Sequence, residues 1–510
     1  MAAFAALARH HRPWGQWATV ALAVLVPMAL AGFVGMVISL GSPQLTLIAA
    51  GSVAGVALFF VPTFAIVSGL LAAALFGVGV MMYYGHIMQA HWLIYGLCLF
   101  LWMKMPIDAL ANRERRVGGG VLPLSWSLVA WFCIAAVSTI FNATPMLYAM
   151  VGARNYVFVW SIAFVVATGA MNPQQLRWCF LFVLVIAALQ LPFAIQQHFL
   201  NFGQGASWDS VVGTMGGDPE GGGGSGPLAL LAAFAMGLAA ALWKRGQLSA
   251  CITLLVLAAA TVSLMLAEVK AFFVFAPVMM GIVLLRELRQ RPAWTLGMLV
   301  LTAALLGATF AYYKATYFDG GASTRRETSV TDYLEYAISA DSALTNNINR
   351  HTGEVSRLGA PLVWLREGAF GGPHARWLGY GMRASRASPA LGKGDAARHF
   401  SFSLTTSTIT AVLWDLGALG LAAIVVTMAL ALTTAWRLSS DKRIPAFHRG
   451  ALEASAGGFA LAFVGLAYND ALVDAFTIQT LYSFLVGYVM FWQRQVRSAN
   501  LKQSNPVGAL

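Results

Sequence analysis

Long apolar segments separated by short polar connections recur along almost the whole chain. A helix needs about twenty residues to cross the ~30 Å hydrocarbon core of a bilayer. Fourteen apolar runs approach or reach that length, at residues 17–40, 44–61, 64–84, 87–105, 122–141, 155–169, 176–199, 227–243, 248–266, 271–285, 294–313, 408–436, 451–468 and 476–492. The pattern predicts an all-α polytopic membrane protein with about 14 transmembrane helices. The second, sixth and tenth runs are the weakest, and re-entrant or broken helices are alternatives there.

The basic residues in the connections predict how these helices are oriented. Lysine and arginine accumulate in cytoplasmic connections, whereas the connections at 41–43, 202–226 and 469–474 contain neither residue. With the N-terminus in the cytoplasm, four connections and the C-terminal tail follow this rule, and their basic residues are Arg113, Arg115, Arg116, Lys244, Arg245, Arg286, Arg289, Arg291, Lys442, Arg443, Arg449, Arg494, Arg497 and Lys502. Both termini are therefore expected in the cytoplasm, and the first run is expected to be a retained helix rather than a cleaved signal peptide.

Composition agrees with a membrane protein and narrows the chemistry. Apolar residues make up 59% of the chain, charged residues only 10%, and the mean hydropathy is +0.70, which excludes a water-soluble globular protein. The cysteines lie inside apolar runs, at Cys98, Cys133, Cys179 and Cys251. We therefore expect no disulfide framework, metal site or cofactor, and no nucleic-acid partner.

One long connection, residues 315–406, divides the chain into three parts. Residues 1–314 would hold the first eleven helices, residues 315–406 a periplasmic catalytic loop, and residues 407–510 the last three helices and a cytoplasmic tail. The loop contains Arg325, Arg326, Arg350, Arg357, Arg366, Arg376, Arg383, Arg386, Lys393 and Arg398. Seven of these fall in residues 357–399, opposed only by Glu367 and Asp395. Basic residues on the translocated face do not help orientation, so they are expected to meet an anion, either substrate phosphate or lipid head groups.

Two isolated cations lie on the same predicted face. Arg154 follows a connection without other charges, and Lys270 lies with Glu268 inside the apolar stretch 248–285. A charge inside a membrane costs about 2.5–3.5 kcal/mol on insertion scales, so something must compensate it. Structural alternatives are a helix-end anchor for Arg154 and a pair with Glu268, or an outward-reaching side chain, for Lys270. The functional interpretation is a phosphate site, because an arginine fork matches two phosphate oxygens.

We predict that these two cations converge with part of the loop on one outward-facing pyrophosphate site. The loop residues chosen for this site are Arg350, Arg357 and Arg376. Its glycan or loop contacts are expected to include Asp218, Glu220, Arg383 and Arg398. Asp218 and Glu220 belong to the glycine-rich segment 211–227, which is either a flexible linker or a ligand-binding loop, since it lacks the Gly-Lys-Ser/Thr ending of a phosphate loop.

The predicted reaction also needs a general base, and His399 is the first choice. It lies at the predicted membrane boundary, and a neutral imidazole accepts a proton near pH 7. Glu354 is second and Asp218 third. His351, His374 and His198 are rival histidines.

Three motifs in the second half of the chain resemble a known signature. They are Leu378-Gly-Tyr-Gly381, His399-Phe-Ser-Phe-Ser403 and Trp414-Asp-Leu-Gly-Ala-Leu-Gly-Leu421. Together they are similar to the bacterial O-antigen ligase and polymerase superfamily, with Asp415 in place of the usual acid and Lys270 where relatives often carry arginine. The resemblance implies a C-type glycosyltransferase (GT-C) architecture with an active site on the periplasmic side of the inner membrane. It also implies transfer of a glycan from undecaprenyl pyrophosphate to an acceptor hydroxyl, without a metal or nucleotide sugar.

Two activities of that superfamily and one other class remain open. The high helix count and the arginine-rich loop favour a polysaccharide polymerase, whose partners would be a lipid-linked glycan donor, a glycan acceptor, the bilayer and a chain-length regulator. An O-antigen ligase, which passes the glycan to an acceptor such as lipid A core, is the first alternative. A transporter or flippase for an anionic solute is the second. No internal repeat and no paired broken helices are apparent in the sequence, which argues against the transporter.

Overall fold

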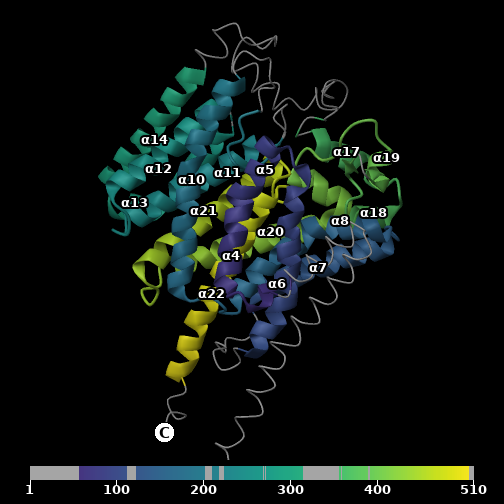
Figure 1. Cartoon of the computed structure of the whole chain (residues 1–510), viewed down its shortest axis with the longest axis horizontal. Coiled ribbons are helices and arrows are strands. Elements are labelled where there is room, and N and C mark those ends of the chain that lie inside the picture. Colours follow the sequence, from purple (N-terminus) through teal and green to yellow (C-terminus); the bar gives the residue numbers. More distant parts are fainter. Residues whose placement is uncertain are drawn as a thin grey trace, which may run out of the picture. The chain divides into compact units, whose positions relative to one another are not determined.

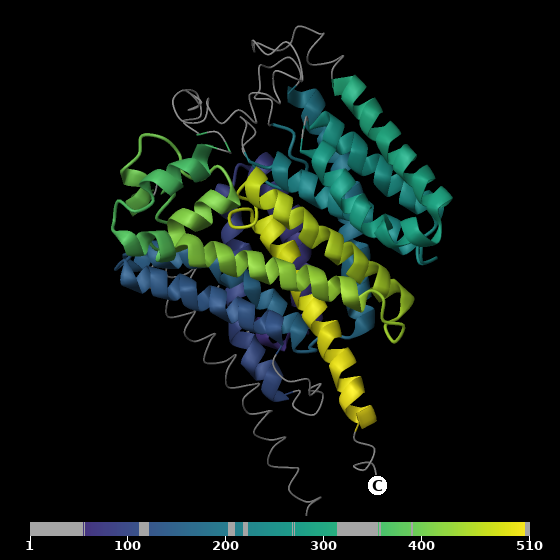
Figure 2. The same ribbon diagram turned by 180° about the vertical axis from the view of Figure 1, so that it is seen from behind.

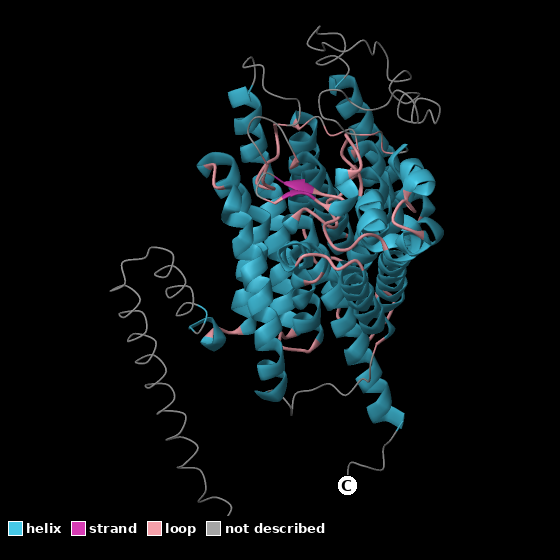
Figure 3. Ribbon diagram, turned by 90° about the vertical axis from the view of Figure 1, so that its right-hand side faces the viewer, coloured by secondary structure: helices cyan, strands magenta, loops and turns pink. Residues whose placement is uncertain are grey.

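The computed structural model describes residues 55, 57–111, 122–201, 210–217, 223–267, 269, 271–313, 355, 357, 359–388 and 391–504. The chain divides into two units, residues 1–66 and 67–510. The first unit is described only at residues 55 and 57–66. In the second unit the described chain is mostly helical, and its two strands form one short hairpin (Figures 1 and 3).

The helices follow the predicted apolar runs closely. The first set comprises α4 (Thr63–Ala72), the π-helical turn η1 (Ala73–Gly77), α5 (Val78–Gly85), η2 (Met88–His91), α6 (Trp92–Ala111), α7 (Pro123–Phe141), α8 (Met146–Tyr156), η4 (Phe158–Trp160), α9 (Ser161–Ala167) and α10 (Pro173–Asn201). The second set comprises α11 (Ser225–Trp243), α12 (Ala250–Leu266), α13 (Phe272–Gln290), α14 (Pro292–Tyr313), α17 (Gly359–Glu367), α18 (Pro373–Leu378), α19 (Asp395–Arg398), α20 (Thr408–Leu438), α21 (Ala446–Tyr468) and α22 (Phe476–Ser504). The strands β1 (Ala387–Ser388) and β2 (Gly392–Lys393) pair antiparallel.

The described helices confirm an all-α membrane protein. Six of them are long and apolar enough to cross a bilayer, or seven if the bent pair α8 and η4–α9 forms one span. The predicted run 17–40 lies outside the described residues, and so does run 44–61 except for residues 55 and 57–61.

Helix α11 forms the centre of the second unit. It is rich in alanine and leucine and is buried by α10, α12, α13 and α21; α20, α21 and α22 pack beside one another (Figure 2). Small residues bring the backbones close: a Cβ added at Gly487 would lie 2.7 Å from the Ala163 carbonyl oxygen. In a bilayer such close packing, rather than hydrophobic burial, holds helices together.

A buried charged cluster joins the connections that the sequence assigned to the cytoplasmic side. Glu453 on α21 is fully buried and accepts from Lys244 Nζ at 2.5 Å and from Arg245 Nη2 at 2.8 Å. Arg286 Nη1 donates to Ser439 Oγ at 2.7 Å. Residues predicted to share one side of the membrane thus lie together in space. The candidate site described below lies at the opposite ends of α20 and α21.

Residues 211–217, the first described part of the glycine-rich segment 211–227, form a packed loop and not a flexible linker. Gln197 Oε1 accepts from the amides of Val212 and Gly213 at 3.0 and 2.7 Å, and Gln190 Oε1 accepts from the Thr214 amide at 2.8 Å. Irregular backbone survives inside a membrane bundle only when its polar groups find such partners. Asp218 and Glu220 lie outside the described residues.

Candidate functional site

Two broken helices meet at the centre of the candidate site. The axis bends by 40° between α8 and η4–α9. Helix α20 is interrupted at Gly417, whose φ of 70° and ψ of −168° are not helical. Tyr156, the last residue of α8, donates its hydroxyl to Asp415 Oδ2 at 2.7 Å. A buried hydrogen bond therefore links the two breaks.

A tight loop from the Leu378-Gly-Tyr-Gly381 motif fills the break in α20. The amides of Tyr380 and Gly381 donate to the carbonyls of Trp414 and Asp415 at 2.9 and 3.0 Å, which replaces hydrogen bonds lost at the break. A Cβ at Gly417 would lie only 2.3 Å from the Trp377 carbonyl oxygen, and both Gly379 and Gly417 have positive φ. Glycine is required at this crossing, because any side chain would separate the two backbones. Two of the three sequence motifs thus form one structural unit.

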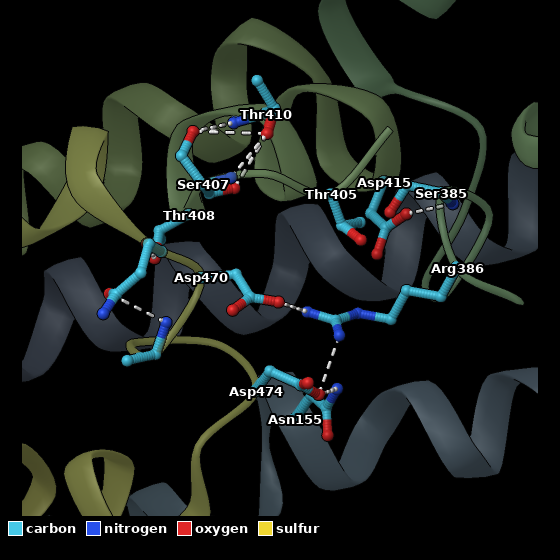
Figure 4. Close-up of polar contacts among 12 residues, drawn as sticks. Asn155, Ser385, Arg386, Thr405, Ser407, Thr408, Thr410, Asp415, Asp470 and Asp474 are labelled. Carbon is cyan, nitrogen blue, oxygen red and sulfur yellow. Dashed lines mark hydrogen bonds and ion pairs between the residues drawn. The ribbon is translucent and has the colours of Figure 1, made fainter. Parts of the chain in front are cut away.

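Asp415 holds the next stretch of the loop in place. Its side chain is fully buried, and besides the Tyr156 hydroxyl it accepts hydrogen bonds from the amides of Arg383 at 3.1 Å and Ser385 at 2.7 Å. Figure 4 shows the contact with Ser385. All three partners are donors, which matches an ionised carboxylate. Arg383 has a φ of 71°, a left-handed conformation that costs roughly 1–3 kcal/mol for a residue other than glycine. The hydrogen bond from its amide to Asp415 helps to maintain it.

Arg383 is a buried cation with unused hydrogen-bonding capacity. Only 4% of the residue is exposed, its guanidinium lies 4.9 Å from the centre of the Tyr148 ring, and its Nη2 donates to Ser388 Oγ at 2.8 Å. Its Nη1 is buried without a hydrogen-bond partner among the described residues. Burial lowers the pKa of Arg383, and the positive charges of Arg154 and Arg386 lower it further. An arginine remains charged despite such a shift. An anion bound here would therefore offset both the burial of this charge and its repulsion by Arg154 and Arg386.

Arg386 connects the loop to the acidic α21–α22 connection. Its Nη1 lies 2.8 Å from Asp474 Oδ1 and its Nη2 lies 3.5 Å from Asp470 Oδ2 (Figure 4). Burial alone would lower the pKa of Arg386, but Asp474 and Asp470 reverse this and raise it above the ordinary value. Its Nε has no hydrogen-bond partner in the described chain. The two carboxylate side chains remain 42% and 31% exposed, so they are accessible from outside the protein.

Arg154 lies in the last turn of α8 and is the third arginine of the candidate site, after Arg383 and Arg386. Its Nη1 lies 2.8 Å from His91 Nε2, and its guanidinium lies 4.9 Å from the Trp92 ring centre and 5.3 Å from that of Tyr95. His91 Nδ1 lies 2.6 Å from the carbonyl oxygen of Met88 and must be the protonated nitrogen there, which leaves Nε2 to accept from Arg154. Burial lowers the pKa of His91, and Arg154 adds to the shift. The neutral imidazole and the rings therefore hold the guanidinium without neutralising it.

We call Arg154, Arg383 and Arg386 the arginine cluster. Sequence reasoning selected Arg154 and Arg383 but missed Arg386. It also missed the polar side chains that position the cluster, which are His91, Asn155, Tyr156, Asp470 and Asp474. The two aspartates could have been noticed, because they are acids in an outer connection that lacks lysine and arginine. Chemically, the cluster can bind an anion through several guanidinium groups, while a nearby carboxylate accepts a proton.

Several predicted pyrophosphate and loop residues lie elsewhere or are not described. The Arg357 guanidinium stacks 4.1 Å from the centre of the Tyr468 ring. Arg376 is exposed and its Nη2 donates to the Leu365 carbonyl at 3.4 Å. Arg398 pairs with Asp395 at 3.1 Å on the surface. The contacts found for these three within the described chain do not join them to the arginine cluster. Lys270, Arg350, Glu354, Asp218 and Glu220 lie outside the described residues.

His399 is exposed and packs on an aromatic group beside the loop. Its ring centre lies 4.1 Å from that of Phe370, which stacks on Tyr380 at 4.4 Å. Its role as the base therefore stays a prediction. Of the rival histidines, His374 contacts Phe141 at 4.9 Å between ring centres, and His198 lies in the last turn of α10. His351 lies outside the described residues.

Comparison with known proteins leaves the interpretation to the site itself. No protein-family model and no curated protein matches this chain. Within the described residues, no group of three His, Cys, Asp or Glu side chains is arranged to hold a metal ion.

The site also corrects one argument from sequence, because two broken helices, α8–α9 and α20, do meet. The absence of paired broken helices can therefore no longer be used against a transporter.

Proposed function

We propose that this protein is a membrane glycosyltransferase that takes a glycan from a polyprenyl-pyrophosphate donor, and specifically a polysaccharide polymerase. The observation that carries the proposal is the arginine cluster, with buried guanidinium N–H groups on Arg383 and Arg386 that have no hydrogen-bond partner in the described chain. A pyrophosphate would supply acceptor oxygens to these donors. The resemblance of the three motifs to the O-antigen ligase and polymerase superfamily provides the sugar chemistry, which the cluster alone does not specify.

The remaining features of the proposal follow from that resemblance and from the charge pattern. They are about fourteen transmembrane helices in a GT-C architecture, a bacterial inner membrane, and an active site that faces the periplasm with both termini in the cytoplasm. The partners would be undecaprenyl-pyrophosphate-linked repeat units as donor and acceptor.

The proposed reaction needs little beyond charge stabilisation and proton removal. An acceptor hydroxyl oxygen attacks the anomeric carbon, and the bond from that carbon to the pyrophosphate oxygen breaks. The arginine cluster stabilises the negative charge that develops on the leaving pyrophosphate. A general base takes the hydroxyl proton. His399 is the base we propose first, and Asp474, which lies next to Arg386 and is 42% exposed, is the second choice.

Single substitutions in a strain that lacks the chromosomal gene test the pyrophosphate site. Arg383→Gln should abolish polymer and cause lipid-linked single repeats to accumulate. Arg398→Gln is the matched control, because Arg398 is a surface arginine of the same loop and should be dispensable. Wild-type polymer from Arg383→Gln, with both proteins at equal level in the membrane, would refute the pyrophosphate site.

The base and the activity can be separated in the same strain. His399→Ala is compared with His374→Ala and Asp474→Asn, and only loss of the true base should stop transfer while donor binding persists. Chains of normal length that never leave the polyprenyl carrier would identify a ligase instead of a polymerase.

A transporter for an anionic solute is a second candidate, because the two broken helices meet at a cationic site as substrate sites in transporters do. Purified protein in proteoliposomes distinguishes the two. Anion flux without glycan transfer would favour the transporter, and transfer in detergent, where there are no compartments, would exclude it as the sole activity.

A further inference from the structure

The short helices α17 and α18 lie beside the site but are far too short to cross a membrane. They have nine and six residues, whereas a span needs about twenty. One side packs into the protein, where Trp364, Ala375, Tyr380 and Trp414 form a buried cluster. The other side is different in character, because large apolar side chains lie next to arginines on it, with the acidic Glu367 beside Arg366.

The outward side of these helices has the composition of a membrane–water interface. Leu365 is 59% exposed and Trp377 is 61% exposed, and the residue next to each along the chain is an exposed arginine, Arg366 or Arg376. Tryptophan and arginine favour that region, where the ring lies at head-group depth and the guanidinium meets phosphate. We call Leu365, Arg366, Arg376 and Trp377 the interfacial patch.

The patch continues onto the ends of the neighbouring helices. His374 of α18 contacts Phe141, the last residue of α7, with 4.9 Å between ring centres. Helix α7 is one of the described spans, so its final residue marks a level close to the edge of the hydrocarbon core. Further exposed apolar side chains lie at the end of α7 and on α8, at Ile140, Phe141, Met146, Leu147 and Met150. Figures 1 and 2 show α17 and α18 gathered with α7 and α8 on one side of the second unit.

We infer that α17 and α18 lie flat in the bilayer interface, with Leu365 and Trp377 among acyl chains and with Arg366 and Arg376 on anionic phospholipid head groups. An exposed apolar surface of this extent is expensive in water, and the neighbouring arginines match a charged lipid surface rather than an apolar protein face. The inference does not depend on the proposed glycosyl transfer.

The contact would fix the depth of the arginine cluster in the membrane. Trp377 lies two residues before Gly379, and its carbonyl lies against Gly417 at the crossing. The same short loop then continues to Arg383 and Arg386. Because this backbone is closely packed, an anchor at Trp377 sets the height of both guanidinium groups relative to the bilayer surface. A substrate with a lipid tail and an anionic head would meet them at that height.

Nitroxide labels at single cysteines test the inference. In a variant without Cys98, Cys133, Cys179 and Cys251, labels at positions 365 and 377 are compared with one at Lys393, an exposed residue of β2. In vesicles containing phosphatidylglycerol, the labels at 365 and 377 should be more accessible to oxygen than to a water-soluble nickel complex, and the label at 393 should show the reverse. Nickel accessibility at 365 and 377 equal to that at 393 would overturn the interfacial position.

Two further measurements cover failure of the cysteine-free variant and test the lipid charge. With native cysteines, brominated lipids should quench a component of the tryptophan fluorescence that disappears in Trp377→Phe, and identical quenching in both proteins would count against the inference. Replacing phosphatidylglycerol by phosphatidylcholine should move the label at 377 outward, and Arg366→Gln with Arg376→Gln should remove this lipid dependence. Equal depth in both vesicles for the protein with native arginines would overturn the head-group contact.

Discussion

Removal of the Asp415 carboxylate should both destabilise the protein and loosen the arginine cluster. In Asp415→Ala, three buried donors lose their acceptor: the Tyr156 hydroxyl and the amides of Arg383 and Ser385. An unsatisfied buried donor costs about 1–3 kcal/mol, so three of them would together cost roughly 3–9 kcal/mol if none found a new acceptor. Relaxation of the loop should give some of these donors new partners, and we therefore expect about 3–5 kcal/mol.

Two milder variants should lose less unfolding free energy than Asp415→Ala. Asp415→Asn keeps one acceptor oxygen but turns an NH₂ group toward at least one donor, and it should cost about 1–3 kcal/mol. Tyr156→Phe removes one donor and leaves two, and it should cost about 0.5–1.5 kcal/mol. Because both residues belong to one hydrogen bond, their effects should not add when combined.

The assay has two readouts. Steric trapping in bicelles gives the free energy of unfolding, and the rise in thermal stability on adding inorganic pyrophosphate reports on the cluster. Asp395→Ala is the control, because Asp395 is a surface residue whose ion pair in the described chain is with Arg398, and it should change stability by less than about 0.5 kcal/mol. If Asp415→Ala matched this control in both readouts, the assignment of Asp415 as the organiser of the loop would be wrong.

Three further predictions concern other parts of the structure. Gly417→Ala should reduce activity and cost at least about 1–2 kcal/mol, because its φ is 70° and its new Cβ would meet a backbone oxygen at 2.3 Å; normal activity and stability would contradict the crossing. Glu453→Ala should cost about 3–5 kcal/mol of unfolding free energy, since it removes the carboxylate nearest to Lys244 and Arg245 and leaves only Glu287, at 3.6 Å from Lys244 Nζ, beside them in the described chain. A change below that of an average surface variant would refute the buried pair. Folding lowers the pKa of His91, so the stability that the neutral imidazole contributes is present above about pH 6.5 and is lost as the pH falls toward the pKa of the folded state. Wild type should therefore lose more stability than His91→Phe between pH 7 and 5. Parallel plots of stability against pH for the two proteins would contradict the neutral contact with Arg154.

The sequence predicted the helices well, because the length of an apolar run is determined by local composition. The run 176–199 lies within α10, and 408–436 lies within α20. The weak run 155–169 does contain the bend between α8 and α9. The interruption at Gly417 was not foreseen, because the apolar pattern continues through it and the loop amides that stabilise it come from a different part of the chain.

The candidate site was only partly predictable for a similar reason. Arg154 could be selected because it is isolated in an uncharged connection, and this isolation can be read directly from the amino-acid sequence. Arg386 was one of seven basic residues between 357 and 399, and only its pairing with Asp474 distinguishes it. That pairing depends on packing between elements that are far apart in sequence.

The hydrogen bond between Tyr156 and Asp415 also sets the order in which the protein can be assembled. Its two residues are 259 positions apart, and Asn155 and Asp474 are 319 apart. At about 5–20 residues per second, the ribosome needs roughly 13 to 50 seconds to proceed from Tyr156 to Asp415. During that interval the end of α8 is in the membrane without its acceptor, so the early helices must wait in an incomplete arrangement that insertion machinery or chaperones have to tolerate. A nascent chain released before α20 would keep the Tyr156 hydroxyl without this acceptor.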